Sequence, residues 1–157
     1  MSDIHSDALV FFGATGDLAF KKIFPALQSM ARRGTLDVPV IGVAKAGWTL
    51  EQFRERARAS LEQHAGSESE LARRLLAQLR YVDGDYNDAA TFSALRGELD
   101  GSQRPAHYLA IPPSMFPTIV RSLASFPATR SSPVADTPRP ARSARRCVPT
   151  KPWLPVT

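Results

Sequence analysis

The sequence predicts an α/β fold: a Rossmann-like, doubly wound parallel sheet, incomplete, followed by a disordered C-terminal tail. Short apolar runs rich in β-forming residues alternate with segments of helical periodicity, as in parallel sheets whose strands are buried on both faces. The first apolar run ends at glycines that open a helix. Beyond residue 126 the apolar periodicity stops. We therefore expect a partial domain over residues 1–126 and a tail over residues 127–157.

The first strand is expected at residues 8–12, an apolar run that ends at Gly13. Gly13 and Gly16 form a tight turn before a helix, and glycine leaves room for a phosphate to approach the free amides at the helix start. The pattern lacks the outer glycines of G-x-G-x-x-G, because Phe11 and Ala19 stand in their places. From the glycines alone, a nucleotide site and a plain βα turn both remain open.

The first helix is expected at residues 17–33, and Gly34 is expected to end it because glycine readily adopts the positive φ of a helix stop. Pro25 lies inside this helix, where it removes one backbone hydrogen bond and clashes with the preceding turn. A kink or a broken turn is therefore predicted at residues 20–24.

The second strand is expected at residues 38–44, a β-branched run that ends just before Lys45. In NAD-binding folds an acidic residue at this point binds the adenosine ribose hydroxyls, whereas a basic residue accommodates the 2′-phosphate of NADP. No acidic residue follows Lys45 before Glu51, so the charge here favours NADP over NAD. The alternative is a solvated lysine on a loop.

Two helices with packing roles are expected next. Thr49 and Gln52 form a capping box, and the helix that follows carries an apolar stripe. Ser67 repeats the capping signal and opens a helix with a leucine at every fourth position up to Leu79. His64 is interpreted as a solvated or capping residue without a catalytic role.

The third strand is expected to begin at Tyr81, and Asp88 is expected to cap the next helix. Asp83, Asp85 and Asp88 lie close together in the sequence, which raises the alternative of a metal site. We prefer turn and capping roles, because these acids lack the ligand spacing of a calcium-binding loop. No metal is therefore expected.

The fourth strand is expected at residues 107–111 and is ended by Pro112 and Pro113, which cannot donate to a strand ladder. In an open α/β sheet, ligands bind beyond the carboxyl ends of the strands. Gly13, Lys45 and Pro112 all lie at such ends. Together these strand ends predict one cofactor-binding rim.

The net charge of +5 belongs to the tail. Residues 1–126 carry 14 basic and 14 acidic side chains, whereas residues 127–157 carry 6 basic and 1 acidic. No nucleic-acid partner and no membrane partner is therefore expected for the folded part. The single cysteine, Cys147, fits a reducing compartment, and no signal peptide or membrane span is predicted, so the expected location is cytoplasmic.

The tail holds 7 of the 13 prolines and has too little apolar patterning to order itself. One interpretation is a basic, proline-rich recognition segment that binds an anionic partner or a P-x-x-P reader. The other, which we prefer, is the product of a shifted reading frame in a GC-rich gene, because such frames encode many Pro, Ala, Arg and Ser residues.

Four ordered segments between residues 9 and 123 match motifs of one known family. They are G-A-T-G-D-L-A-F-K-K, V-I-G-V-A-K, Y-V-D-G-D-Y-N-D and Y-L-A-I-P-P-S. In that order they resemble the nucleotide-binding signature, the second strand, the Y-V-x-G-x-Y-D-D motif and the Y-L-A-[LI]-P-P-[ST] motif of glucose-6-phosphate dehydrogenases. The resemblance implies an oxidoreductase of the pentose phosphate pathway that oxidises glucose 6-phosphate to 6-phosphogluconolactone with NADP.

The resemblance also implies roles for particular residues. Those that cradle the NADP phosphates are Gly13, Ala14, Thr15, Gly16, Asp17 and Leu18. Lys45 corresponds to the basic residue at the 2′-phosphate, where the family often has arginine. Lysine lacks the planar guanidinium group that makes two parallel hydrogen bonds to a phosphate, so a weaker preference for NADP over NAD is expected. Ala110, Pro112 and Pro113 are expected near the nicotinamide. Lys22 is expected on the side of the site where cofactor and sugar meet.

Parts of the family pattern have no counterpart in the sequence. These are the E-K-P-F-G strand, the R-I-D-H-Y-L-G-K-E segment with the catalytic histidine, and the second domain. A base is needed to take the hydroxyl proton as the hydride leaves, and His5, His64 and His107 match no family motif. No catalytic residue is assigned, and this truncated chain is expected to be inactive alone.

Two alternatives to a truncated dehydrogenase stay open. One is a stand-alone NADP-binding module without catalysis. The other is an interaction protein that acts through its basic tail. The sequence predicts no particular oligomeric state.

Overall fold

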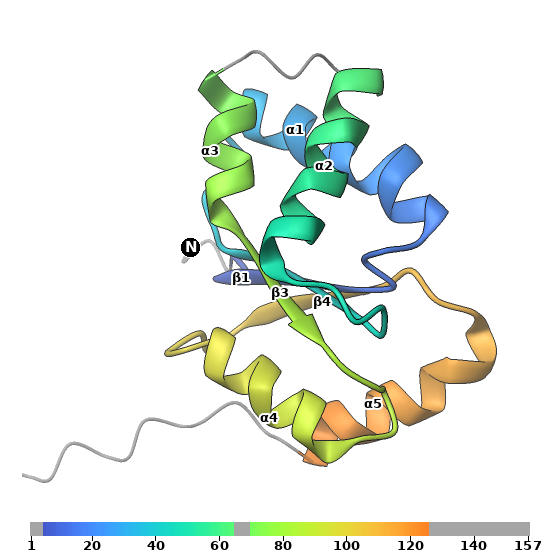
Figure 1. The fold of residues 1–157 in the computed structure, drawn as a ribbon. Coiled ribbons are helices and arrows are strands. Elements are labelled where there is room, and N and C mark those ends of the chain that lie inside the picture. The colour runs from blue at the N-terminus through green and yellow to red at the C-terminus, as the bar shows by residue number, and fades with distance from the viewer. Residues whose placement is uncertain (1–4, 65–69, 126–157) are drawn as a thin grey trace, which may run out of the picture.

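The computed structural model describes residues 5–64 and 70–125, which fold around one parallel sheet (Figure 1). The strands are β1 (Ala8–Phe12), β2 (Val40–Ala44), β3 (Leu79–Asp83) and β4 (Pro105–Leu109). Their order across the sheet is β3-β2-β1-β4, and all neighbours run parallel. This order equals that of the first four strands of a doubly wound sheet, so the predicted Rossmann-like fold class is confirmed.

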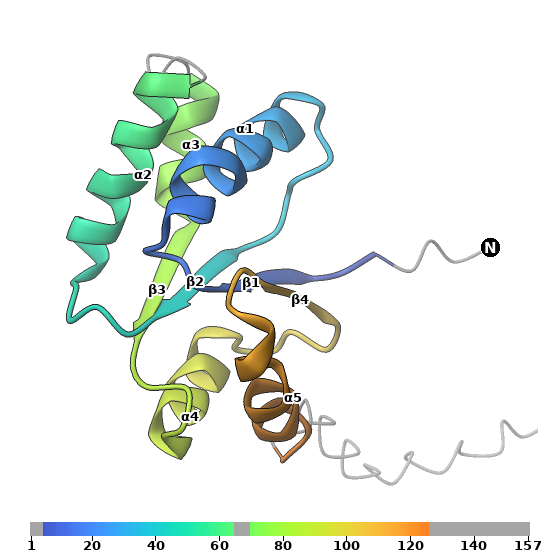
Figure 2. The same cartoon turned by 90° about the vertical axis from the view of Figure 1, so that its right-hand side faces the viewer.

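Helices cover both faces of the sheet (Figure 2). On one face lie α1 (Phe24–Arg32), α2 (Leu50–His64) and α3 (Glu70–Gln78), and on the other lie α4 (Ala89–Glu98) and α5 (Phe116–Ser125). Two short turns, η1 (Ala19–Ile23) and η2 (Pro113–Met115), precede α1 and α5. Within the described ranges, no helix is long and apolar enough to cross a membrane.

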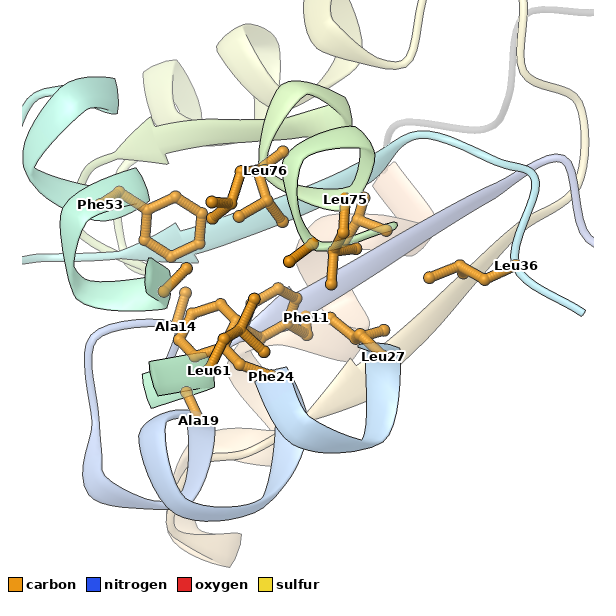
Figure 3. Close-up of a cluster of buried hydrophobic side chains, with 14 of the residues drawn as sticks. Phe11, Ala14, Ala19, Phe24, Leu27, Leu36, Phe53, Leu61, Leu75 and Leu76 are labelled. Atoms are coloured by element: carbon orange, nitrogen blue, oxygen red, sulfur yellow. The ribbon is translucent and has the colours of Figure 1, made fainter. Parts of the chain in front are cut away.

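The core between the sheet and α1, α2 and α3 is built on aromatic rings (Figure 3). Phe11 of β1 lies edge-on to Phe24 of α1, with ring centroids 5.9 Å apart. Phe53 of α2 stacks on Tyr81 of β3 at a centroid distance of 4.9 Å. The three phenylalanine side chains are fully buried, so these contacts hold the helix layer on the sheet.

A second core lies on the opposite face, under α4 and α5. Phe12 of β1 points to this side, whereas its neighbour Phe11 points to the first core, as the alternation of a strand requires. Phe92 of α4 and Ile119 of α5 pack against it. Because both faces of β1 are covered, its sequence is apolar throughout, which is the pattern that predicts a buried parallel strand.

The predicted interruption of the first helix is confirmed. The helix begins at Asp17, and η1 is a π-helical turn in which the amide of Phe24 donates to Ala19 O. The wider turn accommodates Pro25, which has no amide and would clash with the preceding turn of a regular helix. Gly34 follows the helix with φ +71°.

Several predicted boundaries are wrong. β2 begins at Val40 rather than at residue 38, and β3 begins at Leu79 rather than at Tyr81. Leu79 does not belong to the helix before it but begins β3, because it pairs with Val40. The fourth strand lies two residues earlier than residues 107–111, since Pro105 already pairs with Ala8 and the ladder ends at Leu109. Proline is tolerated as the first residue of a strand at the edge of a sheet.

Two predicted helix caps are confirmed. The amide of Thr49 donates to Gln52 Oε1 at 2.9 Å, and the amide of Gln52 donates to Thr49 Oγ1 at 3.3 Å. Asp88 Oδ1 accepts the amide of Ala90 at 2.9 Å. The cap predicted at Ser67 and the tail predicted over residues 127–157 lie outside the described residues.

Candidate nucleotide-binding rim

The candidate site is the carboxyl edge of the sheet, which we call the rim. Each strand contributes the residues that follow its last ladder position. Across the sheet from β3 to β4, these are Asp85, Lys45, the glycine turn of residues 13–16, and Ala110. The structure therefore brings the predicted strand ends together at one edge.

The glycine turn is held against the strands on either side of β1. The Gly13 amide lies 2.9 Å from both Val43 O and the Tyr86 hydroxyl, and the Ala14 amide donates to Val43 O at 3.2 Å. Gly13 has φ +81°, and a Cβ atom there would collide with Ala110 O. Glycine is thus required at this position by the close approach of two backbones.

The later part of the turn offers free donors. Within residues 5–64 and 70–125, the amides of Thr15, Asp17 and Leu18 meet no hydrogen-bond acceptor. A Cβ atom added at Gly16 would meet, outside the adjoining residues, only Gly13 O within 4 Å, at 3.3 Å. The space over Gly16 is therefore open, and an anion has room to approach the amides at the helix start.

Lys45 follows β2 directly, and its ammonium group is paired with a carboxylate. Lys45 Nζ lies 2.6 Å from Asp85 Oδ2, and the lysine side chain is 69% exposed. Asp85 Oδ1 accepts both the backbone and the side-chain N–H of Asn87 at 2.9 Å. The hydrogen bond to Asp85 raises the pKa of Lys45, while Lys45 and then Asn87 lower the pKa of Asp85 to about 2. Both groups are therefore charged at neutral pH.

Asp83 shapes the loop that follows Lys45. Its Oδ1 atom accepts the amides of Ala46 at 2.9 Å and Gly47 at 2.8 Å, and the Tyr81 hydroxyl at 2.8 Å. Burial alone would raise the pKa of Asp83, but these hydrogen bonds together lower it. The turn role predicted for Asp83 and the capping role predicted for Asp88 are thus both present in the structure.

The β4 side of the rim is formed by backbone and prolines. The Ala110 amide donates to Phe12 O at 3.0 Å, which holds this loop beside the glycine turn. Pro112 and Pro113 are exposed, and Pro112 O accepts the amide of Met115 at 3.0 Å as the chain turns into η2. Ala110 therefore lies next to the glycine turn, and Pro112 and Pro113 follow it closely along the chain.

Lys22 and the three histidines are not among the residues that directly follow the strands. Lys22 is exposed on η1, beyond the start of the first helix. His5 precedes β1, and His107 lies in the middle of β4. His64 ends α2, where its Nδ1 atom lies 3.0 Å from Ser60 O.

Sequence reasoning assigns Asp85 only a turn or capping role and assigns no role to Tyr86, although both matter at the rim. Asp85 pairs with Lys45, and the hydroxyl of Tyr86 contacts the glycine turn from 73 residues away. The available signal is positional: Asp85 follows the last residue of β3 closely, as Lys45 follows β2. Comparing the residues just beyond adjacent strands would have placed the two charges side by side.

The fold and the rim define a class of protein. An open parallel sheet in the order β3-β2-β1-β4, with a glycine turn after β1 and a basic residue after β2, is a dinucleotide-binding domain of the Rossmann class. The family model for the NAD binding domain of glucose-6-phosphate dehydrogenase matches residues 10–153. The chain belongs to this family. The match extends past residue 126, so the domain boundary there stays a prediction.

Relatives and solved structures agree with this membership. The chain is 38% identical over 120 residues to glucose-6-phosphate 1-dehydrogenase 1 of Mycobacterium tuberculosis, covering 76% of this chain and 26% of the relative. It is 33% identical over 132 residues to the cytoplasmic isoform of glucose-6-phosphate 1-dehydrogenase of Solanum tuberosum, covering 76% of this chain and 26% of that relative.

Among solved structures, that of the Mycobacterium avium enzyme is 43% identical with a TM-score of 0.69, covering 77% of this chain and 27% of that chain. A glucose-6-phosphate dehydrogenase solved with its substrate glucose 6-phosphate is 28% identical, also with a TM-score of 0.69, over 80% of this chain and 28% of that one. The chain thus spans about a quarter of the length of these relatives. Family membership supports NADP as the cofactor.

Proposed function

We propose that the rim binds NADP and that the chain is the cofactor-binding part of a glucose-6-phosphate dehydrogenase. The observation that carries the proposal is the adjacency of two features at one edge of the sheet. The free amides of the turn after β1 fit a diphosphate, and the ammonium group of Lys45 after β2 fits a 2′-phosphate.

The residues present fit such a cofactor. In the proposal, the amides of Thr15, Asp17 and Leu18 donate to the diphosphate, assisted by the positive end of the helix dipole. Gly13 and Ala14 act indirectly, because their amides bond to Val43 O and hold the turn in shape. Gly16 has no side chain, which leaves room for the diphosphate over the turn.

In the proposal, the nicotinamide end of NADP lies beside the segment that follows β4. The backbone of Ala110 and the rings of Pro112 and Pro113 lie on the opposite side of the turn from Lys45. The exposed Lys22 on η1 is proposed to face the sugar phosphate, since an ammonium group attracts an anionic substrate.

The proposed reaction of the whole enzyme is oxidation of glucose 6-phosphate at C1. NADP, when bound, accepts the hydride, and a base must take the hydroxyl proton. None of His5, His64 and His107 is among the residues that directly follow the strands or matches a family motif. We therefore propose that this chain binds the cofactor without turning over the substrate.

The test is a calorimetric titration of the purified chain with NADP. Wild type is expected to bind, and Gly16→Val is expected to weaken binding at least about tenfold, because the new side chain enters the space over the turn. The matched control is Gly97→Val on α4, where a Cβ atom meets nothing within 4 Å, and it is expected to bind as wild type does. Equal NADP affinity in Gly16→Val and wild type would rule out the proposed cradle.

Two alternatives differ from the proposal in measurable ways. A stand-alone NADP-binding module would also bind NADP, but joining it to the remaining part of a relative would not produce oxidation of glucose 6-phosphate. An interaction protein acting through its basic tail would not need NADP. A cytoplasmic location is part of our proposal, and the Solanum tuberosum relative is a cytoplasmic isoform.

A further inference from the structure

We propose that Asp85 is a specificity-determining residue that reduces the preference of this site for NADP over NAD. The inference rests on the proposed function, because it concerns the ammonium group that would take the 2′-phosphate. It adds a residue from the loop after β3 to a site that the sequence assigns to the ends of β1, β2 and β4.

The first step is the contact itself. Asp85 Oδ2 lies 2.6 Å from Lys45 Nζ. The ammonium group that would bind the 2′-phosphate of NADP is therefore already paired with a negative charge. A 2′-phosphate that approaches Lys45 must either displace this carboxylate or share the ammonium group with it. Since phosphate and carboxylate repel each other, either arrangement costs binding free energy for NADP and not for NAD.

The second step is the difference in mobility between the two partners. Lys45 reaches the carboxylate on a flexible four-carbon stem, and its side chain is 69% exposed. Asp85 is anchored through Oδ1 by the backbone and side-chain N–H of Asn87, both at 2.9 Å, and its side chain is 37% exposed. Lys45 therefore has freedom to turn toward a phosphate, whereas the negative charge of Asp85 stays where it is.

The third step concerns NAD. In NAD-binding folds, an acidic residue at the rim accepts hydrogen bonds from the ribose hydroxyls. Asp85 holds a carboxylate beside the end of β2, although it comes from the loop after β3. The same group that repels a 2′-phosphate is thus suited to accept a 2′-hydroxyl. We expect wild type to bind NAD within about tenfold of NADP.

The test is calorimetric titration of wild type and Asp85→Asn with NADP and with NAD. Asparagine keeps an oxygen for Asn87 but removes the charge, so the ratio of the NAD Kd to the NADP Kd is expected to rise about threefold to tenfold. Asp85→Ser is the second variant and is expected to shift the ratio in the same direction. Asp88→Asn is the matched control: it removes an equal charge from the same loop, at the cap of α4, and is expected to keep the wild-type ratio.

The outcomes separate this inference from the proposed function. A wild type that binds neither nucleotide would overturn both. A wild type that binds NADP, with a ratio that is unchanged in both Asp85 variants, would overturn the role of Asp85 alone. An equal rise of this ratio in Asp88→Asn would also overturn the role of Asp85, because the rise would then follow from the change in net charge and not from the contact with Lys45.

Discussion

The hydroxyl of Tyr86, the last residue of the sequence motif Y-V-D-G-D-Y, holds the glycine turn in place. It accepts the Gly13 amide at 2.9 Å and donates to Val43 O at 3.1 Å. The Tyr86 ring packs edge-on against Phe12 with centroids 5.7 Å apart, and the residue is only 8% exposed. This burial raises the pKa of the Tyr86 hydroxyl, with the Gly13 hydrogen bond acting in the opposite direction.

Tyr86→Phe is expected to lower the free energy of unfolding by about 1 kcal/mol at neutral pH. The cost is moderate because the Gly13 amide and Val43 O keep each other as partners. In wild type, the raised pKa means that the contribution of Tyr86 is complete below pH ~10 and is lost as pH rises further, since only the unfolded chain then ionises readily. Stability should therefore fall less steeply above pH ~10 in the variant than in wild type.

Urea unfolding at several pH values measures both effects. Tyr108→Phe is the matched control, and it is expected to keep the wild-type free energy of unfolding at neutral pH because that side chain is 52% exposed. If the unfolding free energies of Tyr86→Phe and wild type fell in parallel above pH ~10, the buried hydroxyl would not have the role described.

At the scale of residues, the sequence predicts contacts that are local and misses those that are distant. The turn of residues 13–18 is recognisable because its glycines and the helix start lie within six positions. Lys45 is recognisable because it ends an apolar run. Its partner Asp85 is 40 residues away, and only the pairing of β2 with β3 brings the two charges together.

Among the elements, β2 shows how a single glycine sets the distance between sheet and helix. Gly42 lies under α2, and a Cβ atom there would be 2.5 Å from Phe53 Cζ and 2.8 Å from Ala14 Cβ. The missing side chain allows the Phe53 ring to lie directly on the sheet and allows the turn residue Ala14 to pack beside it. The position of the glycine turn thus depends on the packing of β2.

Gly42→Ala is expected to lower the free energy of unfolding by about 2 to 3 kcal/mol, because the added methyl group must displace a buried ring and the turn. Gly97→Ala on α4 is the matched control and is expected to raise it by about 0.5 to 1 kcal/mol, since alanine is the better helix former and has open space there. Urea unfolding of both variants gives the comparison. A Gly42→Ala protein as stable as wild type would contradict the packing described for β2.

Element types are predicted better than element ends. Pro25 correctly predicts an interrupted helix, because its missing amide has a local consequence. The start of β4 at Pro105 is missed because the pairing with Ala8, which defines it, lies far away in the sequence. Leu79 fits the helical leucine spacing but pairs with Val40 as the first residue of β3. Strand pairing therefore overrides the local helical periodicity at this position.

For the whole molecule, the predicted architecture follows from few facts. Buried parallel strands need helical crossovers on both faces, and their carboxyl ends then meet at one edge. That edge carries the turn, Lys45 and Ala110 in the described part of the chain. What the sequence cannot provide is the state of each group on the rim, such as the amides that are already bonded and the ammonium group that is already paired.

The central claim is that NADP binds across the rim, with its diphosphate at the turn and its 2′-phosphate at Lys45. The most direct measurement is an NMR titration of the ¹⁵N-labelled chain with NADP, following each backbone amide. We expect the largest shifts at Thr15, Asp17 and Leu18, a further shift at Lys45, and none at Gly97 near the end of α4. NADP binding that shifts amides elsewhere and leaves residues 15–18 unchanged would contradict it.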